Sequence, residues 1–399
     1  MSLPVRTKMR ILMLNHAVAW RSRLARSYYW GRYLARRGHE VTIVEISDAR
    51  RGGFDVSEED GVAFIGAPDL FKGKLRSGWD PWDVLNRIAY VLPKKYDIVH
   101  SVDSRPVAIL PALASKYLRN AKLIMDWGDW WGRGGTIQGR ATGILEHAFT
   151  SIETFFEEFF RRFADGSIVL SSALKDRAIN LGVDPETILQ TSSGADVERI
   201  QPRNKNNARQ RLGFGLDDKL IGYVGAMLKD DQELLTLSFT IICKMDPKIR
   251  LILIGRKSPK ILDIDPDIQR RVIQVGAVSF NDLHDYVAAC DLMLLPLKNN
   301  VASRGRWPAK IGDYLAGGKP LVATRVGDFF TIIEERRCGV LAEDTPNDFA
   351  IKTVEAIAQH GLIEEMGRNA RKLAETRLDW RLLTAQVEKF YYRILASQR

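Results

Sequence analysis

The sequence predicts an α/β protein built from two doubly wound domains, each a parallel sheet with helices on both faces. Short apolar runs rich in Val, Ile and Leu alternate with helical segments along almost the whole chain of 399 residues, which is typical of parallel strands joined by crossover helices. The alternation occurs in two series, separated by a polar stretch rich in Asn, Gly and Arg at residues 192–219, which indicates a linker. The length also suits two domains of roughly 180 residues better than one.

The first series begins with the strand-like run Arg10–Asn15, followed by a helical segment that Gly38 is well placed to end. Further strand-like runs lie at residues 41–46, 61–68, 97–102, 122–127 and 165–172. This series predicts a first Rossmann-like domain over residues 1–200.

The second series has strand-like runs at residues 220–227, 250–255, 271–276, 291–297, 319–324 and 338–343. It predicts a second Rossmann-like domain over residues 201–378, with the two domains facing each other across a cleft. The rest of the chain is helical, with Leu382, Val387, Phe390, Tyr391 and Ile394 at helical spacing. We expect this last helix, residues 379–399, to pack back on the first domain.

The composition narrows the class of partner. A formal net charge of +10 and a pI near 9.4 favour nucleotides, phosphates, nucleic acid or an anionic membrane face. Three scattered cysteines fit neither a disulfide framework nor a metal cluster and indicate a reducing compartment. No apolar run approaches the roughly 18 residues of a membrane span, and the short apolar start does not read as a signal peptide. The expected location is the cytoplasm.

Ligands of doubly wound sheets bind beyond the carboxyl ends of the strands, so the residues that follow each strand are the candidates. In the second half, Gly225 and Lys229 follow one strand; Gly225 permits close approach and Lys229 could reach a phosphate, although a simple strand-to-helix turn explains them equally well. Gly327, after a later strand, is expected to cap the next helix together with Asp328 and to add amides to the same pocket.

The stretch Ser303–Thr324 carries the main candidate site. Arg304, Arg306 and Lys310 are predicted to crowd the start of a helix, where exposed amides and the helix dipole would bind a diphosphate. Asp313 lies about one turn further, where a carboxylate can accept hydrogen bonds from the two hydroxyls of a ribose. The alternative is a solvated, salt-bridged helix start.

Two segments of the first half are candidates for the acceptor side. The loop Met125–Gly135 contains Asp129 and Trp130 and suits stacking of a sugar, or else is a structural loop with buried tryptophans. The segment beginning at His16 includes Trp20 and Arg21 and interleaves arginines with aromatic residues as far as residue 37. It could meet an anionic acceptor or lipid headgroups, which is the basis for expecting peripheral membrane contact.

Several other patterns are weaker. The acidic run Asp263–Asp267 lies in a Pro-containing stretch without histidine and favours a plain turn over a metal site. No P-loop, no GxGxxG after the first strand and no HExxH metal spacing occur. Phe149, Phe156, Phe160 and Phe163 recur at helical spacing, as in a core. No recognised nucleic-acid-binding module is present, so no nucleic acid is expected.

The order of these short motifs resembles the retaining GT-B glycosyltransferases of family 4, the glycosyl transferases group 1, which include sucrose-phosphate synthase. The likeness is carried in the second half by residues 272–297 and 306–344, and in the first half by residues 34–44, 96–102, 163–183 and 192–202. It covers nearly the whole chain and implies an N-terminal acceptor domain and a C-terminal nucleotide-sugar donor domain.

The family pattern also maps onto individual positions. Asp313 matches the second of two glutamates of the donor site, whereas Gly305 stands at the position of the first. Ala226 and Asp231 stand where the family often has an Arg and a Lys that hold the diphosphate. At an N-domain His-Asp pair this chain has Gly128 and Asp129. The expected glycine pair after the first strand is also absent, and residues 17–23 replace it.

The resemblance implies transfer of a hexose-type sugar from a nucleotide-diphosphate sugar to a glycan, a lipid-linked or another surface-glycoconjugate acceptor, with retention and without an essential metal. We expect Lys229, Arg304, Arg306 and Lys310 to hold the diphosphate, Asp313 the ribose, and Asp129 the donor sugar or the acceptor hydroxyl. A catalytically degraded partner subunit and a GT-B nucleotide-sugar epimerase are the alternatives.

Overall fold

The computed structural model describes residues 8–73, 77–136, 144–256 and 265–397. The chain forms two compact units: unit 1 takes the chain up to Ser192 and again from Trp380, and unit 2 comprises Ser193–Asp379. The sequence placed the boundary at 200/201. The short stretch after Ser192 belongs to unit 2 because the Ala195 amide donates to the Leu378 carbonyl at 2.7 Å, and Ala195 forms a parallel bridge with Asp379.

Unit 1 is built on a sheet whose strands follow, from edge to edge, the order β3 (Asp55–Glu59), β4 (Val62–Ala67), β2 (Glu40–Ile46), β1 (Arg10–Val18), β5 (Ile98–Val102), β6 (Lys122–Trp127), β7 (Gly166–Val169) and β8 (Ile188–Gln190). All neighbours are parallel except the hairpin pair β3 and β4. The central strands are buried on both faces, so β1 carries the continuous apolar run Ile11–Leu14 instead of an alternating pattern.

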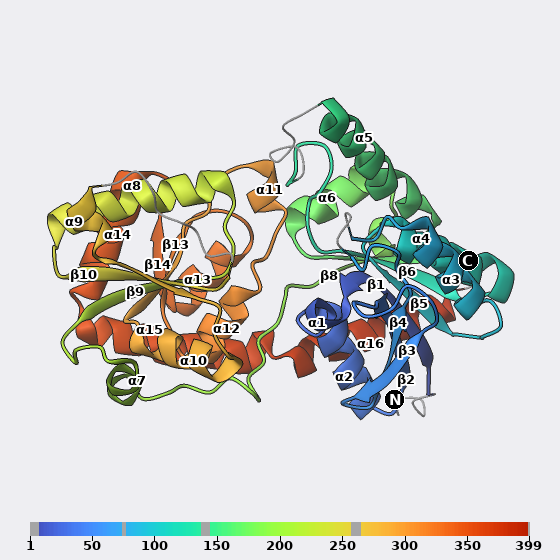
Figure 1. Ribbon diagram of the computed structural model, residues 1–399, viewed down its shortest axis with the longest axis horizontal. Coiled ribbons are helices and arrows are strands. Elements are labelled where there is room, and N and C mark those ends of the chain that lie inside the picture. Colours follow the sequence, from blue (N-terminus) through green and yellow to red (C-terminus); the bar gives the residue numbers. More distant parts are fainter. Residues whose placement is uncertain (1–7, 74–76, 137–143, 257–264, 398–399) are drawn as a thin grey trace. The chain divides into compact units, whose positions relative to one another are not determined.

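The helices of unit 1 are α1 (Ala19–Ser22), α2 (Arg26–Arg36), α3 (Pro81–Val91), α4 (Pro106–Arg119), α5 (Ile144–Phe159), α6 (Ser172–Asn180) and α16 (Trp380–Ala396). One face of the sheet packs against α2 and α16, and the other against α3, α4 and the end of α5 (Figure 1). The chain therefore leaves unit 1 and returns to it with its last helix. The Tyr29 and Trp380 rings stack at 4.7 Å, and the Tyr391 hydroxyl lies 2.6 Å from Nδ1 of buried His100.

Unit 2 repeats this architecture with a parallel sheet in the order β11 (Val272–Gly276), β10 (Ile249–Ile254), β9 (Lys219–Val224), β12 (Leu292–Leu295), β13 (Leu321–Thr324) and β14 (Gly339–Ala342). Its helices are α7 (Lys205–Leu212), α8 (Lys229–Met245), α9 (Pro266–Gln269), α10 (Phe280–Ala289), α11 (Val301–Arg304), α12 (Lys310–Ala316), α13 (Phe329–Arg336), α14 (Pro346–Ile357) and α15 (His360–Leu373). The core on one face joins the sheet to α8 and α14.

Helix α12 is fixed to the sheet and to the linker at close range, which positions the residues of the candidate site. The amide of Val224, at the end of β9, donates to the Tyr314 hydroxyl at 2.8 Å. A side chain at Gly312 would overlap the carbonyl oxygen of Gly194. Glycine is required there because two backbone segments meet without room for a β-carbon.

Candidate functional site

The strand order of each sheet reverses direction at one place, and doubly wound sheets bind ligands in the crevice outside the strands' carboxyl ends at such a place. In unit 1 this switch point lies between β1 and β5, and in unit 2 between β9 and β12. The polar side chains that follow these four strands are therefore the first candidates for ligand contact.

In unit 2, Lys310 is held against the loop that follows β9. Its ammonium donates to the Tyr223 hydroxyl and, at 3.2 Å, to the carbonyl of Ala226, and Tyr223 donates to the same carbonyl at 2.8 Å. Gly225, between them, has φ +84° and donates its amide to the Ile254 carbonyl at 2.8 Å. This conformation favours glycine and brings the backbone close to Lys310.

The surroundings of Lys310 disfavour its charge. Burial lowers the pKa of Lys310 well below its usual value, the charge of Arg306 lowers it further, and the carboxylates of Asp231 and Asp313 oppose the shift. An anion bound beside the ammonium would restore the proton and be stabilised by it. The arrangement therefore suits a phosphate that arrives with its own negative charge.

Asp313 follows Lys310 on α12, and its environment also resists ionisation. Burial raises the pKa of Asp313 to about 7, the nearby carboxylate of Asp196 adds to this rise, and Lys310 opposes it. Asp196 itself is buried and accepts from the Arg199 amide at 3.1 Å. Near neutral pH the Asp313 carboxyl can therefore be converted between a hydrogen-bond acceptor and a donor.

The prediction that three cations crowd one helix start is wrong. Arg304 is the last residue of the short helix α11, and the amides of Gly305 and Arg306 donate to the Val301 and Ser303 carbonyls at 3.0 and 3.5 Å. Only Lys310 begins α12. The physical reason is the separate helical turn before Pro308. In this turn the amides of Gly305 and Arg306, which were expected to be exposed, donate to backbone carbonyls instead.

Arg306 is committed to Asp231. The two form an ion pair, and the Asp231 carboxylate, 1% exposed, also accepts from the Lys298 amide at 2.8 Å. Burial raises the pKa of Asp231, whereas Arg306 and the amide lower it. The pair ties the segment after β12 to the first turn of α8, and we call it the Asp231–Arg306 latch.

Two further predicted donor residues lie near this crevice. Lys229 is exposed at the first residue of α8. Gly327 has φ +75° before α13. Asp328 takes the N-cap position of α13, but its side chain makes no capping hydrogen bond, so the predicted cap is wrong. The backbone of Asp328 is helical, with φ −77° and ψ −20°, and this explains the difference, because a capping side chain needs an extended N-cap residue.

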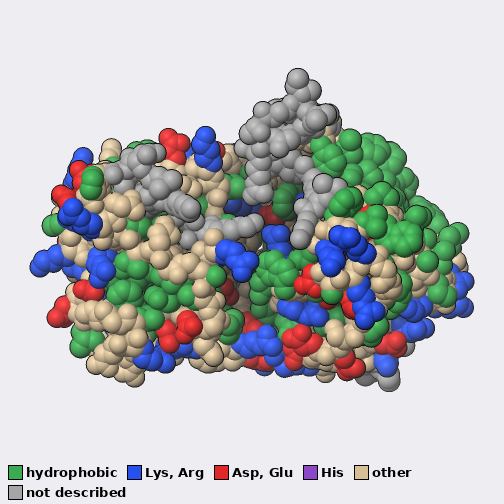
Figure 2. Space-filling model, in the orientation of Figure 1, with side chains coloured by type: hydrophobic (Ala, Val, Ile, Leu, Met, Phe, Trp, Pro, Cys, Tyr) green, Lys and Arg blue, Asp and Glu red, His purple; other side chains and the backbone are tan. Residues whose placement is uncertain are grey.

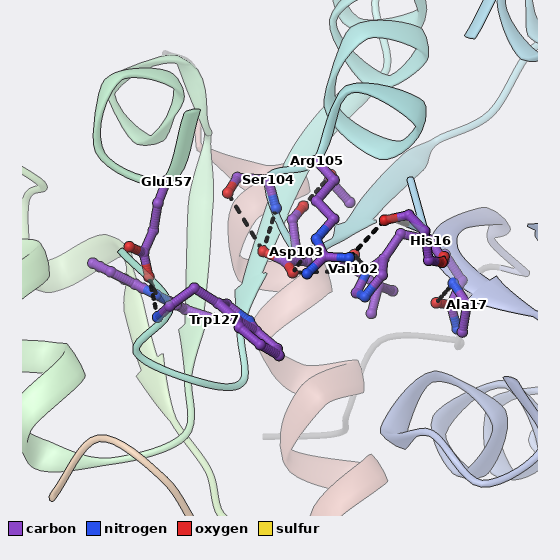
Figure 3. Close-up of polar contacts among 12 residues, drawn as sticks. His16, Ala17, Val102, Asp103, Ser104, Arg105, Trp127 and Glu157 are labelled. Atoms are coloured by element: carbon purple, nitrogen blue, oxygen red, sulfur yellow. Dashed lines mark hydrogen bonds and ion pairs between the residues drawn. The ribbon is translucent and has the colours of Figure 1, made fainter. Parts of the chain in front are cut away.

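In unit 1, the switch point brings His16 from β1 beside Asp103, which follows β5 (Figure 3). Nδ1 of His16 lies 3.3 Å from the Val102 carbonyl and 3.7 Å from Oδ2 of Asp103. Nε of Arg105 lies 3.8 Å from the same oxygen. Asp103 has φ +78°, a conformation that a non-glycine residue adopts only where its surroundings enforce it.

The Asp103 carboxylate has one occupied and one open oxygen. Oδ1 accepts from the Ser104 amide at 2.7 Å and the Ser104 hydroxyl at 3.4 Å, whereas Oδ2 accepts no hydrogen bond within the described part of the chain. Burial and Arg105 lower the pKa of His16 to about 4, so its imidazole is neutral at pH 7. The cluster can accept a hydrogen bond from a hydroxyl group at Oδ2.

Sequence reasoning missed Asp103. The signal available was its position directly after a strand, but nothing in the sequence shows that this strand lies beside β1. The adjacency that matters arises only from the strand order.

The tryptophan-rich loop after β6 is organised by one buried carboxylate. Glu157 of α5 accepts from Nε1 of Trp127 at 2.8 Å, from the Trp131 amide at 2.9 Å and from the Gly132 amide at 2.7 Å (Figure 3). Trp127 is fully buried, with the Arg161 guanidinium 3.7 Å from its ring. For Trp127 the structural alternative is therefore the correct one.

Asp129 and Trp130 lie further along this loop and are partly exposed. Nε1 of Trp130 donates to the Arg133 carbonyl at 2.8 Å, and Arg177 lies over its ring at 4.3 Å. The charge of Asp129 acts on Arg26, whose Nη2 is 3.6 Å from Oδ1 of Asp126.

The aromatic residues of segment 20–37 do not form one surface. Trp20 is 61% exposed, and Arg21 is exposed beside it in α1. Tyr28, Trp30 and Tyr33 instead belong to the core beneath α2. The aromatic part of the predicted membrane contact is therefore mostly unavailable, because α2 turns those rings toward the sheet.

The described residues contain no group of three or more His, Cys, Asp or Glu side chains arranged to hold a metal ion. Asp263 lies outside the described residues, and Asp265 caps α9 through the Asp267 amide at 2.7 Å. No helix among the described residues is long and apolar enough to cross a membrane.

Two family models match the chain. One, described as glycosyl transferases group 1, matches residues 218–359, and one described as a glycosyl transferase 4-like domain matches residues 25–194. Among curated relatives, D-inositol 3-phosphate glycosyltransferase 2 of Catenulispora acidiphila is 25% identical over 55% of this chain and 53% of its own length. A D-inositol 3-phosphate glycosyltransferase of Corynebacterium urealyticum is 30% identical over 39% of each chain. The chain thus spans about half or less of the length of these relatives.

Solved structures share the fold over almost the whole chain. Sucrose-phosphate synthase from Thermosynechococcus elongatus superposes with a TM-score of 0.71 at 18% identity, covering 98% of this chain and 100% of that one. Anabaena HepE in complex with UDP-glucose gives a TM-score of 0.68 at 16% identity, covering 96% and 100%. These neighbours establish the fold as GT-B.

The latch predicts a large difference between two neighbouring arginines. Arg306→Ala should leave the Asp231 carboxylate buried without its cation and lower the free energy of unfolding by roughly 3 kcal/mol. Arg304→Ala, the matched control on an exposed side chain, should change it by less than about 0.5 kcal/mol. Urea unfolding of both variants and of Arg306→Ala/Asp231→Ala measures this. Equal effects of the two single substitutions would show that the ion pair is not formed.

The raised pKa of Asp313 predicts a pH-dependent stability. Because the folded state binds the Asp313 proton more tightly than the unfolded state, this group costs stability progressively as pH rises from about 4 to about 7. Asp313→Asn should therefore raise the melting temperature by a few degrees at pH 8 and leave it nearly unchanged at pH 4. Thermal unfolding at both pH values tests this, with exposed Asp217→Asn as control. A gain of equal size at the two pH values would contradict it.

Proposed function

Because the chain belongs to the group 1 family of GT-B glycosyltransferases, we propose that it is a retaining glycosyltransferase. It transfers a hexose-type sugar from a nucleotide-diphosphate sugar to a glycan, a lipid-linked or another surface-glycoconjugate acceptor. Among related proteins, Anabaena HepE has been crystallised with UDP-glucose, and a putative teichuronic acid biosynthesis glycosyltransferase of Bacillus subtilis is 24% identical over 70% of this chain. UDP-glucose is therefore the first donor to test.

The observation that carries the proposal is the position of Lys310 and Asp313 at the switch point of unit 2. Their spacing on α12 suits a diphosphate beside Lys310 and a ribose beside Asp313. Gly225 and Tyr223 keep the ammonium beside the backbone after β9. Lys229 and Arg304, both exposed, can approach the outer phosphate oxygens. Gly327, with φ +75°, allows the left-handed turn of the backbone that leads into α13.

The chemical step requires stabilisation of the departing diphosphate. The bond between the anomeric carbon and the phosphate oxygen breaks, and negative charge grows on the diphosphate as it leaves. A positioned ammonium such as Lys310 stabilises that charge without a metal ion, so we include metal independence in the proposal. Arg306 contributes indirectly, because the latch holds the segment that leads to Lys310.

The acceptor side is assigned to unit 1. Oδ2 of Asp103 accepts a hydrogen bond from the attacking hydroxyl, and neutral His16 and Arg105 keep the carboxylate in place. The hydroxyl oxygen bonds to the anomeric carbon on the face that the diphosphate leaves, its proton passes to Oδ2 of Asp103, and the diphosphate departs as the anion. Asp129, Trp130, Trp20 and Arg21 stay candidates for contact with the rest of the donor sugar or the acceptor.

A catalytically degraded partner subunit is the main competing function. It is favoured by Gly305, Ala226 and Asp231 at positions where the family pattern has functional residues. Such a protein would bind a nucleotide tightly and turn over no donor with any acceptor. An epimerase would instead interconvert two nucleotide sugars without releasing nucleotide.

Removal of the Lys310 ammonium should slow the release of nucleotide from the sugar donor. We expect Lys310→Ala to lower nucleotide release from the best donor by roughly 100-fold, because the leaving diphosphate loses its nearest cation. Nucleotide release from a panel of UDP, GDP and ADP sugars measures this, with Lys352→Ala on the exposed part of α14 as control. Failure of every nucleotide sugar to bind would overturn the proposed function.

Removal of the Asp103 carboxylate should slow the reaction of the acceptor hydroxyl. Asp103→Asn should reduce kcat by roughly 10–1000-fold while the KM for the donor changes little, because Asp103 belongs to unit 1. The measurement is steady-state kinetics with an acceptor panel that begins with D-inositol 3-phosphate, after the names of the relatives. A rise in donor KM with unchanged kcat would contradict the assignment.

A further inference from the structure

Helix α3 carries its charges on the inside and its apolar side chains on the outside. Asp83 and Arg87 are its only charged residues, and they form an ion pair at 2.7 Å with both side chains fully buried. On the outer side, Trp82 is 42% and Leu85 61% exposed. A surface helix of a protein in water normally shows the opposite distribution.

The neighbouring helices continue the same surface. Tyr117 and Leu118 of α4 and Ile152 and Phe155 of α5 are exposed, and the Phe155 ring stacks on Phe159 at 4.8 Å. Figure 2 shows hydrophobic side chains gathered over this part of unit 1, where Figure 1 places α3, α4 and α5. We call the outer side of these three helices the apolar face.

The three helices form one continuous layer. Nη1 of Arg87 on α3 donates to the Val107 carbonyl of α4 at 3.3 Å. Nζ of Lys116 on α4 donates at 2.8 Å to the carbonyl of Phe163, in the turn that continues α5. The exposed apolar side chains therefore belong to a single surface of a single unit. Monomeric proteins rarely leave contiguous patches of this kind in water.

Basic residues outnumber acids at the margin of the apolar face, where Asp97 is exposed and Asp165 is paired with Lys116 at 2.8 Å. Each of the three helices precedes a parallel strand of the sheet, so the helices run in the same direction and end at the same edge. Lys94 and Lys95 follow α3, Lys116 and Arg119 end α4, and Arg162 follows α5. Among the described acids of these helices, Asp83, Glu153 and Glu157 are buried.

Glu158 is the remaining acid of these helices whose side chain is described, and it is paired with Arg177 at 2.8 Å. An apolar surface with aromatic residues and a row of Lys and Arg at one edge is complementary to lipid chains beside anionic headgroups. A protein surface of ordinary composition carries both signs of charge and would not be complementary to this basic edge.

We propose that the apolar face docks on the surface of an anionic lipid bilayer, with Trp82, Leu85 and Phe155 at the level of the headgroups and the basic edge against lipid phosphates. This inference does not depend on the transferase activity. It also replaces the expected contact through residues 20–37, most of whose aromatic rings are buried.

Vesicle flotation tests the proposal with the full chain. We expect the protein to float with vesicles that contain phosphatidylserine and to float far less with pure phosphatidylcholine vesicles. Leu85→Glu and Phe155→Glu should each reduce the bound fraction about tenfold. Leu237→Glu, at a leucine of α8 in unit 2 with 47% exposure, is the matched control and should bind like the original chain. Circular dichroism and thermal unfolding verify that each variant is folded.

Three outcomes would overturn the proposal. The first is no flotation with either vesicle. The second is equal loss of binding in Leu237→Glu and Leu85→Glu, which would place no special role on the apolar face. The third is a dimer in light scattering that Leu85→Glu dissociates, which would identify the face as an interface between copies of this chain. Lys94→Glu/Lys95→Glu separates attraction to charged headgroups from apolar insertion. Its loss of vesicle binding should disappear at high salt, because salt screens the charges.

Discussion

Both units depend on the handedness of the crossover connection. A strand, a helix and a parallel strand connect in one hand, so a reversal of strand order beside the first strand of each unit places helices on both faces of its sheet. In both sheets this places the carboxyl end of the first strand beside the end of a strand far along the chain, β5 for β1 and β12 for β9. The crevices at these places are consequences of topology, and the chemistry of each unit depends on which side chains follow the four strands.

The Asp231–Arg306 latch explains how the donor site departs from the family pattern. A carboxylate at Asp231 would be costly in its buried position if it stood alone. Arg306 supplies the opposite charge from the other side of the crevice, so the unusual acid on α8 and the unusual base before α12 compensate one another. The pair cross-links α8 and the segment after β12, and it leaves Arg306 bound to Asp231 instead of available to a ligand. In the proposed donor site the charge of a diphosphate would then be met mainly by Lys310, whose ammonium donates to the Tyr223 hydroxyl and the Ala226 carbonyl.

The sequence was sufficient for the fold because strands and helices leave periodic patterns in it, and the two parallel sheets are confirmed by the structure and by the GT-B neighbours. It was less informative for the site, since the important relations there are non-local. The separate turn at α11 depends on Asn300, whose side chain accepts from the Ser303 amide, and no periodicity marks it. Glu157 lies in a helix with the pattern of an amphipathic surface segment. Its carboxylate nevertheless accepts hydrogen bonds from Trp127 and Gly132 and so organises the loop after β6. Asp103 matters only because β5 lies beside β1.

The apolar face and the proposed acceptor site share one helix, and this favours one acceptor class over the others. Arg105 is the N-cap residue of α4, and Asp103 lies two residues before it, so the acceptor cluster adjoins the start of the helix whose outer side carries Tyr117 and Leu118. A helix of 14 residues is about 21 Å long, less than the thickness of the hydrocarbon core of a bilayer. A protein held on a bilayer by the basic edge at the end of α4 would keep Asp103 at the other end of this helix, about one helix length from the lipid phosphates. An acceptor anchored in the same bilayer would stay within reach of that distance, whereas a free glycan would gain nothing from the docking, so a lipid-linked acceptor is the class to test first.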